Sequence, residues 1–154
     1  MGCAHRTLLT MLIAAAAQTQ AAAADIHGLA GFVRPAYLAM NIAAMCARTD
    51  PHFLSDTSGP RGTPLHYAQH VKDEAIAGLP QADAIAVLKL AADDARRAAR
   101  AMLYERARPG DDIGTARAIK EWCDTEAKRI VLGFIGNHDE THSASEEFLE
   151  QAKR

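Results

Sequence analysis

Two histidine-containing segments hold the side chains whose types and spacing are best suited to chemistry. The first segment, HYAQHVKDE, places His66, His70 and Glu74 four residues apart, and the second, HDETHSASE, repeats this spacing with His138, His142 and Glu146. Residues four apart share one face of a helix, and two imidazoles so placed can chelate a transition metal. If the two segments meet, four imidazoles and two carboxylates would form a zinc, copper or nickel site.

A different interpretation of these histidines stays open. Ser143 and Glu146 have the spacing of a capping box, which predicts a last helix that begins near residue 144. His138 and His142 would then lie in a loop, where the helical spacing has no meaning. The pattern H-x-x-x-H is also short enough to arise by chance, so the histidines could simply be exposed on solvated faces. Apart from such an ion, no cofactor is expected.

Catalytic motifs are missing from the sequence. It has no G-x-S-x-G elbow, Walker A loop, G-x-G-x-x-G or H-E-x-x-H, no C-x-x-C-H for haem and no twelve-residue EF-hand loop. A nucleophile paired with a base is not evident either. This favours a non-catalytic protein without excluding an enzyme.

Three residues are candidates for contact with a partner. Trp122 could anchor another protein, although a single tryptophan in a small helical protein also suits the core. Arg97 and Arg100 lie in a basic run that could receive an anionic group. The alternative is that these arginines form ion pairs on the helix surface with nearby acids such as Asp94.

Residues 1–24 have the pattern of a secretory signal peptide. A short n-region precedes the apolar run Leu8–Ala17, whose length of about ten residues suits an h-region and is too short to span a bilayer. The small residues Ala22–Ala24 predict cleavage between Ala24 and Asp25. The alternative is an uncleaved membrane anchor. No later segment has the ~18 uninterrupted apolar residues of a spanning helix, so we expect a mature chain without a membrane span, in the periplasm or secreted.

Composition supports a single exported domain. The 154 residues carry a net charge of −2, with 49% hydrophobic and 23% charged residues, as in ordinary globular domains. Loss of Arg6 with the signal peptide would bring the charge to −3, which disfavours a nucleic-acid partner. Abundant alanine and arginine with few lysines suggest a GC-rich bacterial genome, and hence the periplasm.

Cleavage would leave two cysteines, Cys46 and Cys123. An even pair in an oxidising compartment predicts one disulfide, closing a loop of about 80 residues. The alternative is two buried free thiols. Neither cysteine belongs to a Cys-x-x-Cys motif, so we interpret the bond as a structural staple.

The elements that must position these side chains are predicted to be helices. Val, Ile and Thr are sparse, and no segment alternates at period two. The expected helices are 34–48, 63–78, 81–106, 113–135 and 144–153, with a long loop over 50–62. Residues 25–154 are thus predicted to be one all-α domain, a bundle of four to five helices that could also pair as a homodimer.

The leading functional hypothesis is an exported, non-catalytic binding, chaperone or accessory protein. Its partner would be another periplasmic protein or a small ligand. The alternative is a periplasmic protein that binds or senses a transition metal through the two histidine segments.

Overall fold

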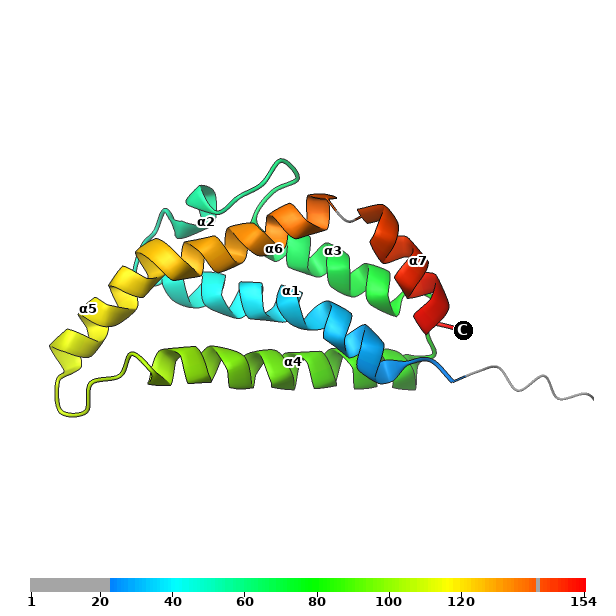
Figure 1. The fold of residues 1–154 in the computed structure, drawn as a ribbon, viewed down its shortest axis with the longest axis horizontal. Coiled ribbons are helices and arrows are strands. Elements are labelled where there is room, and N and C mark those ends of the chain that lie inside the picture. The colour runs from blue at the N-terminus through cyan, green and yellow to red at the C-terminus, as the bar shows by residue number, and fades with distance from the viewer. Residues whose placement is uncertain (1–22, 141) are drawn as a thin grey trace, which may run out of the picture.

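The computed structural model describes residues 23–140 and 142–154, with the side chains of 142–144 left out, and is built from helices (Figure 1). The elements are α1 (Ile26–Cys46), α2 (Phe53–Asp56), α3 (Pro64–Ile76), α4 (Gln81–Tyr104), α5 (Asp112–Trp122), the π-helical segment η1 (Cys123–Ala127), α6 (Lys128–Glu140) and α7 (His142–Ala152). No strand occurs in these residues, which confirms the all-α class. Residues 1–22, which hold most of the predicted signal peptide, lie outside the described residues.

The described part of the chain has six helices of at least 11 residues, where four to five were predicted. The expected helix 113–135 is divided by η1 into α5 and α6. The helix also continues through Gly136 and Asn137, past its expected end at residue 135. Gly136 does not have the positive φ of a helix-ending glycine, in contrast to Gly78 after α3.

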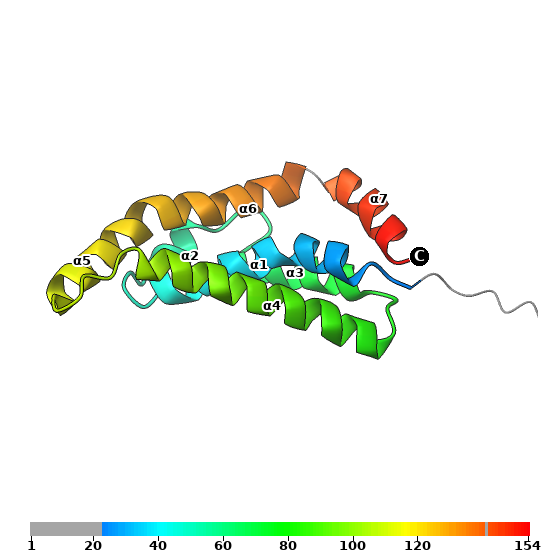
Figure 2. The ribbon, with the colours of Figure 1, turned by 60° about the horizontal axis from the view of Figure 1, so that its bottom comes forward.

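Helix α1 is the centre of the bundle. Helix α4 lies along one side of α1 and α6 along the other, and α3 contacts all three (Figures 1 and 2). Eight α1 residues are buried at spacings of one, three and four, from Leu29 to Cys46. By length and composition alone α1 could cross a membrane, with a mean hydropathy of 1.3. In the bundle, its apolar residues instead pack against the surrounding helices.

The start of α1 differs from the expectation. The helix begins at Ile26, eight residues before the predicted Arg34, and Pro35 lies inside it. The Asp25 side chain caps the helix by accepting a hydrogen bond from the Gly28 backbone N–H at 2.9 Å. The predicted helix 34–48 placed Pro35 in the first turn, where the backbone N–H that proline lacks is not needed. Inside α1, Pro35 costs one backbone hydrogen bond, and the packing of α1 against several helices outweighs this cost.

Helices α3 and α4 agree better with the sequence. Thr63 caps α3 by accepting from the His66 N–H, and Pro64 is its first residue, which agrees with a helix predicted to start at residue 63. The buried residues of α4 are Val87, Ala91 and Ala95, whereas the large apolar side chain of Ile85 is 57% exposed.

Candidate metal centre

Two helices bring together three of the six predicted metal ligands. His70 and Glu74 lie one turn apart on α3, and His138 comes from α6, which contacts α3. One ligand atom from each residue lies within 4.8 Å of the others. His70 Nδ1 is 3.5 Å from a Glu74 carboxylate oxygen, and the rings of His70 and His138 meet edge to face with centroids 5.4 Å apart.

This ligand set fits a transition metal. Zinc binds imidazole nitrogens and carboxylate oxygens at ~2.0–2.2 Å, so two of its tetrahedral ligand atoms lie about 3.4 Å apart. His70 and Glu74 are already near that separation. The other ligand atoms lie within 4.8 Å of one another, so each pair must approach by up to about 1.4 Å, which rotation of the half-exposed His70 side chain can supply. The described side chains thus offer three ligands, one fewer than a tetrahedral zinc ion takes.

His138 occupies the most protected position of the three. Its side chain is 8% exposed, against 47% for His70 and 25% for Glu74. The prediction that a capping box leaves His138 in a loop is wrong, because α6 extends to Glu140 and α7 begins at His142. Helix α6 and the helical spacing of α3 together define the site.

A group beside His138 holds its ring in place. The Tyr67 ring meets His138 edge to face at 5.4 Å, and the Tyr67 hydroxyl donates to the Asp139 carboxylate at 3.0 Å. Arg61 donates its backbone N–H to the Tyr67 hydroxyl at 3.2 Å, and its Nε lies 3.2 Å from Asp139. These contacts anchor the loop before α3 to the end of α6, next to the site.

This supporting role could not be assigned from the sequence. Tyr67 and Asp139 each directly follow a predicted ligand, which is the only signal available. Their contact spans 72 residues, and local spacing carries no information about such a pairing.

Of the other predicted ligands, His66 and Glu146 are not part of this group. His66 is exposed at the beginning of α3. Glu146 lies on α7, where it lines a groove of about 600 Å³ together with Glu74. The side chain of His142 lies outside the described residues. Lys153 fixes α7 at this groove by donating to the Glu74 backbone carbonyl at 2.6 Å.

Burial gives His138 a pH-dependent effect on stability. Desolvation lowers its pKa, as do the nearby charges of His70 and Arg61, whereas Glu74 and Asp139 oppose the shift. The unfolded chain therefore takes up this proton first as the pH falls below about 6.5. The corresponding stability is present above that pH and is lost as the pH falls toward the folded-state pKa.

We therefore expect the chelator-treated protein to lose stability between about pH 7 and 5 more steeply than a His138→Leu variant. Urea unfolding at several pH values measures both slopes. Leucine is close to histidine in volume and does not titrate, so the difference between the slopes isolates His138. Equal slopes would contradict the lowered pKa.

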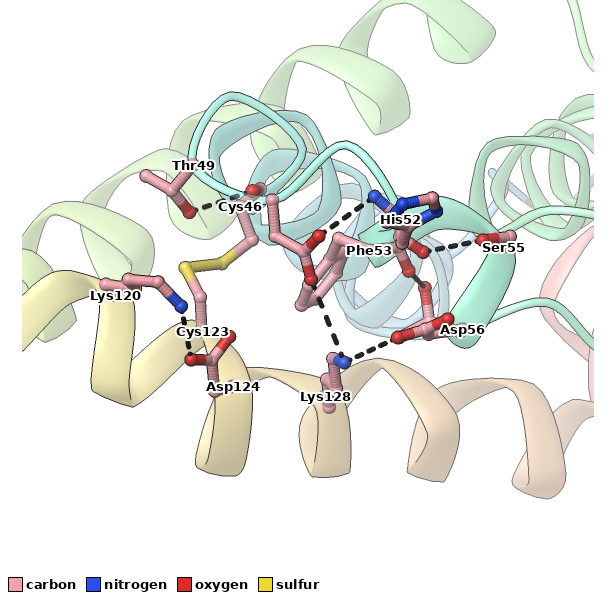
Figure 3. Close-up of polar contacts among 12 residues, drawn as sticks. Cys46, Thr49, His52, Phe53, Ser55, Asp56, Lys120, Cys123, Asp124 and Lys128 are labelled. Atoms are coloured by element: carbon pink, nitrogen blue, oxygen red, sulfur yellow. Dashed lines mark hydrogen bonds and ion pairs between the residues drawn. A yellow bond between two sulfur atoms is a disulfide. The ribbon is translucent and has the colours of Figure 1, made fainter.

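The predicted disulfide is present. Cys46, the last residue of α1, is bonded to Cys123 at the start of η1, with 5.5 Å between their Cα atoms (Figure 3). Both residues are fully buried. Lys128 lies nearby, with its Nζ 2.7 Å from Asp56 and 3.9 Å from Asp50. The bond and these ion pairs attach the long loop after α1 to the start of α6.

The predicted partner-binding residues lie elsewhere. Trp122 is 4% exposed and packs in the core, as its alternative interpretation predicted, with the Arg106 guanidinium 4.7 Å above its ring. Arg97 forms an ion pair with Asp94 on the surface of α4, and Arg100 is exposed on the same helix. A partner-binding role for Trp122, Arg97 or Arg100 stays a prediction.

Comparison of the chain with protein-family models, with curated proteins and with solved structures finds no match. The candidate metal centre is therefore inferred from geometry and chemistry alone.

Proposed function

We propose that this protein binds a transition-metal ion through His70, Glu74 and His138. The observation that carries the proposal is the convergence of two imidazoles and a carboxylate, from helices distant in sequence, within 4.8 Å. Zinc is the metal that this set suits best, because two histidines and one glutamate make a three-ligand zinc site with an open position. Nickel and copper also accept imidazole ligands.

The surroundings of the three ligands favour metal binding. A metal binds neutral imidazole, and burial lowers the pKa of His138 and so keeps it neutral. Neighbouring contacts that orient ligands strengthen metal sites. Here the Tyr67 ring and the Asp139–Arg61 ion pair surround His138.

We place this binding function in the periplasm or outside the cell. The support is the signal-peptide pattern of residues 1–24 and the disulfide between Cys46 and Cys123, a bond typical of oxidising compartments. The broader hypothesis of a non-catalytic binding or accessory protein then acquires a specific ligand, the metal ion.

A zinc titration of the chelator-treated protein tests the proposal. Calorimetry should show one zinc ion per chain near pH 7.5, and binding that weakens as the pH falls because protons compete for the imidazoles. Magnesium should not bind comparably, since it prefers oxygen ligands. The His66→Leu variant should retain full affinity, because His66 lies outside the group. Absence of stoichiometric zinc binding would refute the proposed site. So would a loss of zinc affinity in His66→Leu as large as that in His138→Leu.

A further inference from the structure

We propose that a hollow beside the metal centre binds a small aromatic molecule carrying one donor atom for the metal; the inference rests on the proposed function. The hollow has a volume of about 260 Å³ and is lined by residues of α1, α3, α6 and α7. His138 belongs both to this lining and to the ligand group. A molecule in the hollow would therefore lie next to an ion held by His138.

The walls of the hollow suit an aromatic body with one polar end. Phe32 and Phe134 contribute aromatic surface from two helices, and Val71 adds an aliphatic wall. The polar lining is contributed by Asn137, His138 and Ser145. Small-molecule sites commonly combine mostly apolar walls with a few polar groups that orient the ligand.

Two features give the hollow its shape. Phe32 stacks on Phe148 of α7 with ring centroids 5.7 Å apart, which fixes the position of this wall. Gly31 lies within α1, and a Cβ added there would meet nothing within 4 Å. Glycine inside a helix is less stable than alanine. Neither the backbone angle φ of Gly31 nor a close contact requires glycine at this position. Because Gly31 lines the hollow, its missing side chain leaves that part of the hollow open.

The test compares two probes that share a donor and differ in their aromatic body, imidazole and 4-phenylimidazole. Calorimetry on the zinc-loaded full chain should show 4-phenylimidazole binding at least about tenfold more tightly, because its phenyl ring buries apolar surface. The Gly31→Leu variant fills the hollow. It should lose the preference for the phenyl ring while keeping zinc affinity and imidazole binding.

Gly133→Leu is the matched control. Gly133 also lies within a helix with nothing within 4 Å of an added Cβ, and it lines a neighbouring hollow instead. This variant should keep the wild-type preference.

The possible failures are distinguishable. Zinc binding without a preference for 4-phenylimidazole, or a preference that survives Gly31→Leu, would overturn the inference and leave the proposed function intact. If zinc does not bind, the metal-linked ligand is overturned with the proposed function. In that case 4-phenylimidazole is tested on the metal-free chain. Binding there, if it is abolished by Gly31→Leu, would show that the hollow binds the aromatic molecule without a metal.

Discussion

Reduction of the Cys46–Cys123 disulfide is expected to lower the free energy of unfolding by about 4 kcal/mol. The bond joins residues separated by 77 positions, so it removes many conformations from the unfolded chain. Since about 1 kcal/mol corresponds to roughly 3 °C for a chain of this size, Tm should fall by about 12 °C. Urea unfolding with and without a reducing agent measures the difference.

A double variant, Cys46→Ala with Cys123→Ala, supplies the control. It should be destabilised at least as much as the reduced wild type and should not respond to the reducing agent. The reduced wild type keeps both sulfur atoms in the core, so it separates loss of the crosslink from loss of buried volume. Equal stability of the oxidised and reduced wild type would contradict the stapling role.

The His138→Leu variant is expected to lose about 100-fold in zinc affinity. Four-ligand structural zinc sites contribute about 10–16 kcal/mol, or about 3 kcal/mol per ligand, and each 1.4 kcal/mol is a factor of ten. The side chain is 8% exposed, and leucine retains most of its apolar packing against Tyr67. Competition between the protein and a chromophoric zinc chelator gives the affinities.

His66→Leu is the matched control, because it makes the same replacement at an exposed histidine of α3. It should leave the affinity within about twofold of the wild type. Glu74→Gln preserves the shape of the third ligand and removes its charge, so it should also weaken binding if His138→Leu disturbs the fold. Unchanged affinity in both His138→Leu and Glu74→Gln would place the metal elsewhere.

Local signals in the sequence predict some elements well and others poorly. Thr63 and Pro64 fix the start of α3 because a cap and a first-turn proline act within a few residues. The same rule fails at Pro35, where packing from distant helices decides the outcome. The disulfide was predictable because only one pairing remains once Cys3 is set aside.

All three residues of the candidate site were among the predicted ligands, but only the pair on α3 could be placed together from local spacing. The four-residue spacing places His70 and Glu74 together, since both lie on one helix. The repeated spacing in residues 138–146 identified the second segment, but no pattern in the sequence indicated that the two segments meet or how α6 would be oriented. His138 joins the group through the packing of α6 against α3, and His66 is excluded by its position at the start of α3.

The central place of α1 also orders events during synthesis. This helix is made before any of the elements that cover it, and the helices α6 and α7, which complete its enclosure, follow about a hundred residues later. The backbone N–H of Asp25 bonds to the carbonyl of Ala152 at 2.8 Å, so the start of the domain is closed only by its last helix. Until α7 is in place, the apolar surface of α1 therefore lacks part of its cover.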